Sequence, residues 1–152
     1  MDELTNKKNM ALWVAHSLFD RGKTSGTSAN ISFLHQGKIY ISASGSCFGT
    51  LKEDDLIPVP CDEESKLSGR KPSKELRLHQ ILYQKNPGAG AVIHTHGPYA
   101  VLWSCLHHDD TENVLPAYTP YLQMKLGRVP LVPYGPPGSE ELFQNMEQVA
   151  AE

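Results

Sequence analysis

Two histidines and one glutamate in this sequence have the residue types and spacing of a metal centre. His94 and His96 lie two positions apart in the apolar run 89–96, and Glu75 precedes them. If the run is a β-strand, both imidazoles share one face and point at the same spot. A catalytic zinc ion normally has three protein ligands, drawn from histidine, carboxylate and thiolate, and an open position. The pattern therefore indicates most of a metal site, with Glu75 as a ligand or as a general base whose pKa a cation would lower.

Each of these residues also has a purely structural interpretation. A glutamate in the first turn of a helix is stabilised by the helix dipole alone. Two strand histidines can each be core side chains that hydrogen-bond locally. The combination of Glu75 with two histidines on one strand face nevertheless favours a metal site. The run 107–110, His-His-Asp-Asp, lies in a polar loop and is interpreted as solvated surface.

Three segments rich in small residues have the composition of phosphate-binding turns. They are residues 27–30, 42–45 and 72–74, which combine hydroxyl groups and backbone N–H groups with the cation of Lys74. Such groups bind phosphate, especially at a helix N-terminus like the one predicted at Ser73. Each segment alone is more typical of an ordinary turn or helix cap. Three of them leading toward one predicted metal favour a phosphate site.

The spacing of apolar and turn residues predicts the elements that would position these groups. Ser73 is predicted to cap a helix that ends at Lys85, on which Glu75 shares a core-facing stripe with Leu78, His79 and Leu82. Residues 89–96 are predicted to form a buried strand. The other predicted elements are a helix over 4–19, a hairpin of strands 31–34 and 38–42 about Gln36-Gly37, a surface connection over 51–69 with a short strand at 57–59, a helix over 98–106, an edge strand at 129–132 and a helix from Ser139. We expect a mixed α/β layer fold in one domain.

Composition sets broad limits on partners and compartment. The chain has 152 residues, 39% of them hydrophobic and 20% charged, enough for one globular domain with its own core. A net charge of −3 and a pI of about 6.1 give no reason to expect nucleic-acid or anionic-membrane binding. The sequence has no apolar run of transmembrane length, and its first residues do not resemble a signal peptide. Three widely spaced cysteines indicate reduced thiols, and we expect a cytoplasmic protein.

The order and spacing of these segments resemble the class II aldolase/adducin family over essentially the whole chain. The segments that carry the resemblance are Thr27-Ser28-Ala29-Asn30-Ile31-Ser32, Ser42-Ala43-Ser44-Gly45, Lys71-Pro72-Ser73-Lys74-Glu75 and His94-Thr95-His96-Gly97-Pro98. Further segments are similar to the branch of the family that contains 3-oxo-tetronate 4-phosphate decarboxylases, namely 104–106, 113–116, 119–121, 127–134 and 137–138.

The resemblance implies a fold and a set of site residues. The fold is a three-layer αβα arrangement whose central, mainly antiparallel sheet is flanked by helices, in a homotetramer with sites between subunits. His94 and His96 match the zinc ligands, and Glu75 matches an acid/base that can touch the metal. Tyr121 lies near the position of a catalytic tyrosine in the family's aldolases. The residues at the family's phosphate-binding positions are Ser28, Asn30, Ser44, Gly45 and Ser73, to which Lys74 could add a charge.

The reaction implied by the resemblance is a metal-dependent carbon–carbon cleavage. In the decarboxylase branch, Zn²⁺ would stabilise the enediolate left when CO₂ departs, and protonation through Glu75 would give dihydroxyacetone phosphate. A class II sugar-phosphate aldolase would use the same apparatus for retro-aldol cleavage. A third alternative is an adducin-like interaction domain without catalysis.

Two positions depart from the family pattern. Ala29 replaces the usual glycine before Asn30. The family's third zinc histidine lies beyond the helix predicted from Ser139, and no histidine follows His108 in this sequence. We therefore expect a single domain over 1–152 whose C-terminal part is missing, or a chain whose metal binding is weakened to the point of inactivity.

Overall fold

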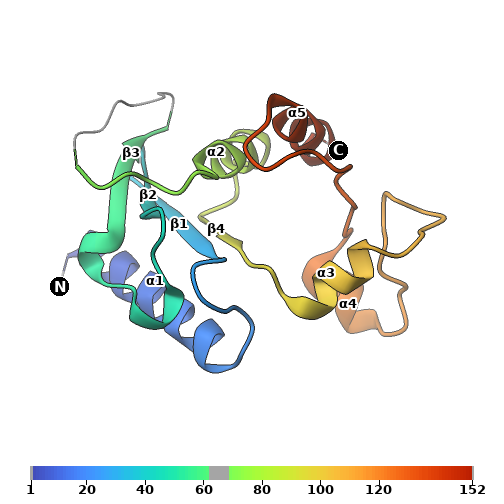
Figure 1. The fold of residues 1–152 in the computed structure, drawn as a ribbon, viewed down its shortest axis with the longest axis horizontal. Helices are drawn as coiled ribbons and strands as arrows, with labels where there is room; N and C mark the ends of the chain where they lie inside the picture. The colour runs from blue at the N-terminus through green and yellow to red at the C-terminus, as the bar shows by residue number, and fades with distance from the viewer. Residues whose placement is uncertain (1, 62–68, 152) are drawn as a thin grey trace.

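A four-stranded sheet forms the centre of the protein (Figure 1). The structure, a computed structural model, describes residues 2–61 and 69–151, so residues 62–68 of the predicted surface connection and Glu152 lie outside the described part. The strands are β1 (Asn30–His35), β2 (Lys38–Ser42), β3 (Leu56–Pro60) and β4 (Ala91–His94). Their order is β3-β2-β1-β4, and every neighbouring pair is antiparallel, as predicted from the family resemblance.

The hairpin between β1 and β2 forms where the sequence predicts it. Its two-residue loop consists of Gln36 and Gly37, whose φ angles are both positive, at 47° and 72°. This is the backbone conformation of a type I′ turn, which matches the twist of the two strands that it joins. The turn fixes the register, and Phe33 pairs with Tyr40 across the hairpin. Their rings stack 5.2 Å apart on one face of the sheet.

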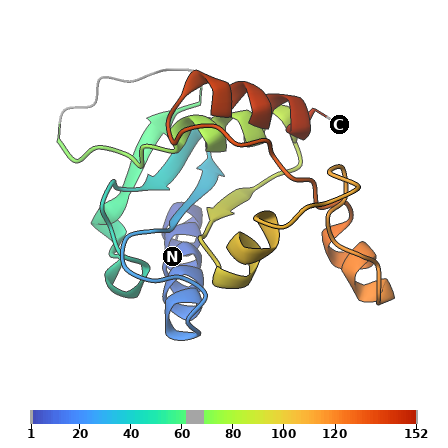
Figure 2. The same ribbon diagram turned by 45° about the vertical axis from the view of Figure 1, so that its right-hand side comes forward.

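Helices cover both faces of the sheet, which gives the predicted three layers (Figures 1 and 2). Helix α1 (Glu3–Asp20) packs its buried Ala11 and Ala15 against Ile31 and Phe33 of β1. Helix α2 (Leu76–Lys85) lies on the opposite face, where Tyr83 joins a cluster with Ile39, Ile41 and Val59. Two 3-10 helices, η1 (Phe48–Thr50) and η2 (Glu53–Asp55), connect β2 to β3. Helix α5 (Glu140–Ala150) forms where the sequence predicts a helix from Ser139, and it stacks on α2; the Ser139 hydroxyl caps it by accepting a hydrogen bond from the Leu142 N–H.

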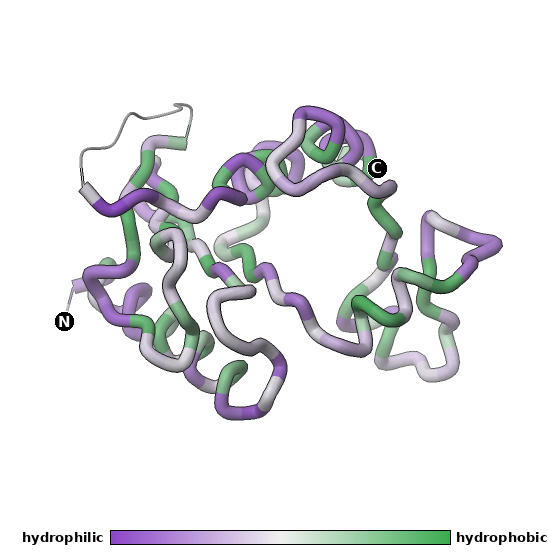
Figure 3. Tube along the Cα trace, viewed as in Figure 1, coloured by the Kyte–Doolittle hydropathy of each residue, from purple (hydrophilic) through white to green (hydrophobic). Residues whose placement is uncertain are grey.

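Helices α3 (Pro98–Ser104) and α4 (Pro120–Leu126) lie beside the layered core, and neither buries a residue. Apolar stretches nevertheless recur along this part of the chain (Figure 3). The predicted helix over 98–106 is thus confirmed in a shorter form, while α4 was not predicted. Within the described part of the chain, no helix combines the length and apolar character that crossing a bilayer requires.

Two predicted boundaries around the site are wrong. Helix α2 begins at Leu76, and its N-cap residue is Glu75 instead of Ser73. The backbone N–H of Ser73 donates to Ser42 and its hydroxyl accepts from Glu75, which keeps residues 73–75 outside the helix. Strand β4 ends at His94 and lies at the edge of the sheet, so it is partly exposed instead of buried.

The predicted edge strand over 129–132 does not form. The Val129 carbonyl accepts from Val114, and the Leu131 N–H donates to Thr111, at 2.9 and 2.8 Å. Pro130 between them has no N–H, so this contact does not extend into a ladder. The segment therefore runs as irregular chain between α4 and α5.

Candidate metal and phosphate site

The pairing of β1 with β4 brings the first two site residues together. Asn30 lies opposite His94 in the antiparallel register, and Ser32 lies opposite Val92. Because side chains alternate along a strand, Asn30 and Ser32 share one face of the sheet. That face is covered by α2, since Ser32 contacts His79 and Tyr83. The N-terminus of α2 therefore lies above the ends of both strands.

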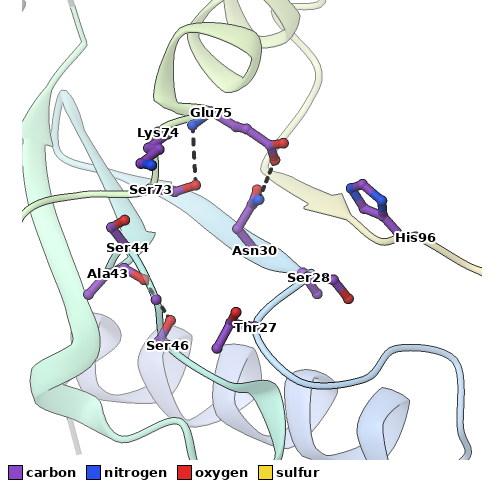
Figure 4. Close-up of a pocket in the computed structure, with 12 residues that line it drawn as sticks. Thr27, Ser28, Asn30, Ala43, Ser44, Ser46, Ser73, Lys74, Glu75 and His96 are labelled. Carbon is purple, nitrogen blue, oxygen red and sulfur yellow. Dashed lines mark hydrogen bonds between the residues drawn. The ribbon is translucent and has the colours of Figure 1, made fainter. Parts of the chain in front are cut away.

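Glu75 connects the helix to the two strands. Its carboxylate Oε2 accepts hydrogen bonds from Nδ2 of Asn30 and from Nδ1 of His94. His96 follows the end of β4, and its ring lies 4.9 Å from that of His94 between centroids. Figure 4 shows the Glu75 and Asn30 side chains directed toward each other, with His96 on the opposite side of the same opening. The structure thus gathers the three predicted metal ligands from two elements.

The donor atoms of this cluster fit a zinc ion. One ligand atom each from Glu75, His94 and His96 lies within 4.8 Å of the others, and no second such cluster occurs in the described ranges 2–61 and 69–151. Ligands of a tetrahedral zinc at about 2.1 Å are themselves about 3.4 Å apart, so modest side-chain rotation suffices. Two imidazoles with one carboxylate are also a known donor set of catalytic zinc. These three residues could hold a zinc ion.

The environment of Glu75 favours its charged form. Partial burial acts to raise the pKa of this carboxyl, but hydrogen bonds from His94 and Asn30 and the nearby histidine charges outweigh it. The pKa therefore lies below its ordinary value. An ionised carboxylate at neutral pH can accept a proton or bind a cation, so its state suits either predicted role.

A polar cavity of about 310 Å³ opens beside the metal cluster. An isolated bridge between Ala43 and Pro72, with the Ser44 N–H donating to Lys71 at 2.9 Å, joins two of the predicted phosphate-binding segments. Gly45 adopts a φ of 76°, which side-chain-bearing residues rarely do. The cavity is lined by Thr27, Ser28, Ala29, Asn30, Ala43, Ser44, Gly45, Ser46, Ser73, Lys74, Glu75 and His96.

The lining residues differ in what they offer an anion. The hydroxyl and the backbone N–H of Ser28 both donate to the Ser25 carbonyl, so its donors are engaged. The Ser73 hydroxyl accepts from the Glu75 N–H and keeps its own hydrogen for another acceptor. Lys74 brings the positive charge, and Asn30 has a second amide N–H beside the one that contacts Glu75. Residues from all three predicted phosphate-binding segments line this cavity. Among them, Ser28 has the hydrogen-bond donors that are least available to a phosphate.

Tyr121 does not line this cavity. It lies on α4 with 69% of its surface exposed, outside the layered core. His107 and Asp109 form a solvated pair at 3.3 Å, consistent with the interpretation of residues 107–110 as surface. The described chain therefore assembles the metal and phosphate residues without the tyrosine.

A buried network behind Glu75 was not predicted. Asn30 Oδ1 lies 2.5 Å from Nε2 of His79, whose Nδ1 lies 2.7 Å from the Ser32 hydroxyl. The Ser32 hydroxyl in turn lies 2.8 Å from the Tyr83 hydroxyl. Burial, with the nearby His94 charge, lowers the pKa of His79 to about 4 and keeps the ring neutral. Glu75, His79 and Tyr83 follow one another at intervals of four residues, and this spacing was the sequence signal that could have indicated the network.

Comparison with known proteins agrees with this geometry. The chain is 41% identical over 140 residues to the 3-oxo-tetronate 4-phosphate decarboxylase of Escherichia coli K12, covering 91% of this chain and 66% of that protein. It is 34% identical over 131 residues to the L-fuculose phosphate aldolase of Methanococcus vannielii, covering 86% of this chain and 68% of the other. The crystal structure of YgbL from Escherichia coli superposes with a TM-score of 0.91 at 37% identity, over 99% of this chain and 72% of that one.

The chain thus spans about two thirds of the length of the curated relatives that it matches. The family described as class II Aldolase and Adducin N-terminal domain matches residues 11–152. The antiparallel sheet between helices and the cluster of Glu75, His94 and His96 lie within that range. The chain belongs to the class II aldolase and adducin N-terminal domain family.

Proposed function

We propose that this chain carries the zinc and phosphate sites of a carbon–carbon lyase that decarboxylates a 3-oxo-tetronate 4-phosphate to dihydroxyacetone phosphate and CO₂. The observation that carries the proposal is the position of the Glu75, His94 and His96 cluster beside the cavity that contains Ser44, Ser73 and Lys74. A sugar-acid phosphate needs both the metal cluster and the phosphate-binding residues, because its phosphate must be held while its carboxylate end reacts.

Glu75, His94 and His96 would hold the zinc ion. When bound, zinc supplies a Lewis acid that withdraws the electron pair released as the carbon–carbon bond breaks. The carboxylate carbon leaves as CO₂, and the electron pair remains on the adjacent carbon of the substrate. That carbon must then gain one proton to give the product.

Glu75 is proposed to move this proton. Its carboxylate is held between Asn30 and His94 and is partly accessible at the edge of the cavity. A carboxyl group with one face toward the reacting carbon can deliver a proton and be restored by solvent. The depressed pKa of Glu75 indicates that the charged form is the resting state of the free protein, so the carboxylate takes up a proton from solvent before it delivers one to the carbon.

The phosphate end of the substrate would lie among Ser44, Gly45, Ser73 and Lys74, with Ser28 and Asn30 at the rim. Hydroxyl donors and one ammonium group offer directed hydrogen bonds together with charge neutralisation. Binding energy from this remote group would hold the reacting bond near the metal. The role of the phosphate is therefore orientation.

A class II sugar-phosphate aldolase is the second candidate, since the 34% identical relative carries that name. It would use the same residues, and the departing fragment would be an aldehyde instead of CO₂. In that case Tyr121, exposed on α4 here, would be expected to reach a site in an assembled oligomer.

We further propose a cytoplasmic homotetramer. Tyr99 and Leu102 on α3, and Met124 on α4, are large apolar side chains left exposed by the single chain, as at subunit interfaces. Cys47, Cys61 and Cys105 form no disulfide with one another, as expected of thiols that the cytoplasm keeps reduced. Light scattering of the purified protein tests the assembly, and a monomeric mass would contradict it.

Product analysis tests the reaction. The zinc-loaded protein is incubated with 3-oxo-tetronate 4-phosphate, and dihydroxyacetone phosphate, CO₂ and aldehyde are measured. We expect dihydroxyacetone phosphate and CO₂ in equal amounts and no aldehyde. Glu75→Gln, which keeps the shape but cannot carry the proton, is expected to lower turnover about 10²- to 10⁴-fold. His107→Ala serves as a control, because His107 is exposed and pairs with Asp109 outside the cavity.

The other outcomes identify the alternatives. Cleavage of an L-fuculose phosphate with release of an aldehyde would assign the protein to the aldolases. Absence of zinc binding together with absence of turnover would leave the adducin-like interaction domain. Equal activity of Glu75→Gln and the unmodified protein would remove Glu75 from the mechanism.

A further inference from the structure

We propose that His79 is a positioning residue, which holds the Glu75 carboxylate in its working orientation through the side chain of Asn30. The inference rests on the proposed function of Glu75 as metal ligand and proton carrier. His79 itself does not line the phosphate cavity. It would act on the site only through its hydrogen-bonded neighbours.

The path from His79 to Glu75 is short and continuous. Nε2 of His79 lies 2.5 Å from Oδ1 of Asn30, and Nδ2 of the same amide contacts Glu75. His79 is 1% exposed, and Asn30 is 8% exposed. The contact between His79 and Asn30 is thus enclosed between α2 and the sheet, where water cannot substitute for it, whereas the contact between Asn30 and Glu75 lies at the cavity. If the His79 side chain is replaced, the Asn30 amide must therefore lose this hydrogen bond or change its position.

The charge of Glu75 determines the direction of every hydrogen bond in the path. An ionised carboxylate only accepts, so the Asn30 amide must present its N–H₂ group to Glu75 and its oxygen to His79. The oxygen needs a donor, which is the Nε2–H of His79. Because the ring is neutral, its Nδ1 then accepts from the Ser32 hydroxyl, 2.7 Å away.

The far end of the path supports the same direction. The Ser32 hydroxyl donates its hydrogen to His79, so it accepts a hydrogen bond from the Tyr83 hydroxyl at 2.8 Å. Ser32 is fully buried and Tyr83 is 9% exposed. One consistent arrangement therefore satisfies all five side chains, and each bond donates toward Glu75. A reversed amide would place two oxygens against each other at Glu75.

The amide of Asn30 also limits what the path can do. Its N–H₂ group and its oxygen hold fixed donor and acceptor roles, so the chain does not conduct a proton from Tyr83 to Glu75. What it transmits is orientation. His79 fixes the amide, and the amide fixes one oxygen of Glu75, while His94 contacts the same oxygen from the sheet edge. Both contacts are made by Oε2 of Glu75, so its second oxygen takes no part in them.

Two matched amide variants separate positioning from packing. His79→Gln places an amide nitrogen near the position of Nε2 and keeps a donor for Asn30, whereas His79→Asn reaches only the position of Nδ1 and loses that donor. Both variants remove the ring. We expect zinc affinity and turnover to fall about 10- to 100-fold in His79→Asn, as for other partners of metal ligands, and to stay within about threefold in His79→Gln. Equal losses in both variants would overturn the proposal.

A spectroscopic measurement on the unmodified protein tests the same proposal without any substitution. In ¹⁵N-labelled protein, the ring nitrogens of His79 report which one carries hydrogen. The expected result is a neutral ring with hydrogen on Nε2 alone, at neutral pH and without metal. Hydrogen on Nδ1, or on both nitrogens, would overturn the proposal, because Asn30 would then lack the donor or Ser32 the acceptor.

The two readouts distinguish failure of the inference from failure of the proposed function. If the unmodified protein shows no turnover, the zinc affinities of the two variants and the His79 tautomer still test the positioning. If the unmodified protein is active and the two variants behave alike, the positioning fails while the reaction stands.

Discussion

The described residues of the first part of the chain, 2–61 and 69–96, and those of the second part, 97–151, bury apolar surface to very different extents. In the first region Ile39, Ile41 and Phe48 have at most 1% of their surface exposed, and the core clusters lie on both faces of the sheet. In the second region Val114 is the one buried apolar residue. Local hydrogen bonds hold that region together, such as the one from the Trp103 indole to the Val114 carbonyl at 2.8 Å.

The difference explains which site residues the chain can position alone. Glu75 and His94 are held at elements that pack on the common core, and Glu75 contacts both Asn30 and His94. Tyr121 lies in the region without a core, and 69% of its surface is exposed. A chain can preorganise a site only where its own packing fixes the backbone. The candidate metal and phosphate residues therefore come together within one chain, whereas α4 buries no residue and is not supported in this way.

Truncation of one apolar side chain in each region gives the largest expected contrast. Ile41→Ala removes a side chain with 0% exposure, which costs about 2–5 kcal/mol of unfolding free energy. Leu102→Ala removes one that is 65% exposed, and at high dilution it should cost less than about 0.5 kcal/mol. Urea denaturation at two protein concentrations measures both.

The concentration dependence sharpens the comparison. If the proposed assembly covers α3, the cost of Leu102→Ala grows with protein concentration, while that of Ile41→Ala stays constant. A cost at high dilution as large as that of Ile41→Ala would mean that the second region has a core of its own, and the contrast would be lost.

Acid should weaken the first region through His79. Burial lowers the pKa of this imidazole to about 4, whereas in the unfolded chain it is about 6.5. Between these values the unfolded state binds the extra proton, so stability is full above about pH 6.5 and falls as the pH falls. From about pH 7 to about pH 5 the loss should be about 2 kcal/mol.

Urea denaturation of the unmodified protein and of His79→Gln at the two pH values isolates this contribution. The variant should lose about 2 kcal/mol less stability over the same interval. An unchanged pH dependence in His79→Gln would show that His79 titrates normally and that the network around it is open to water.

An effect smaller than those expected at Ile41 and His79 concerns a cap in the second region. The Ser139 hydroxyl accepts from the Leu142 N–H at 3.1 Å at the start of α5. Ser139→Ala should cost about 1 kcal/mol, because it leaves a helix N–H without its partner. Since α5 stacks on α2, thermal unfolding should show this cost in the main transition. A separate early transition of α5 would instead place α5 outside the cooperative unit.

Sequence patterns predicted well what depends on nearest neighbours. The Gln36-Gly37 turn, the start of a helix at Ser139 and the histidine pair at His94 and His96 are all local signals, and the structure contains each of them. The phosphate segments were predicted from composition, and their meeting in one cavity required the bridge between Ala43 and Pro72.

Patterns failed where a distant partner decides the outcome. Ser73 has the composition of a helix cap, but its backbone N–H donates to Ser42 of β2, so the helix begins later. The network through Ser32 and His79 joins β1 to α2, and periodicity shows only that His79 faces inward. Such contacts depend on the register of the strands. The hairpin that sets this register lies far from α2 in the sequence.

Anomalous diffraction at the zinc absorption edge, on crystals of the protein grown with zinc, tests the central claim most directly. We predict one dominant peak within about 2.0–2.2 Å of a nitrogen of His94 and of His96, with a Glu75 oxygen at a similar distance. The peak should disappear in His94→Ala and persist in His107→Ala. A dominant peak at His107 and Asp109, or none at the predicted cluster, would contradict the account.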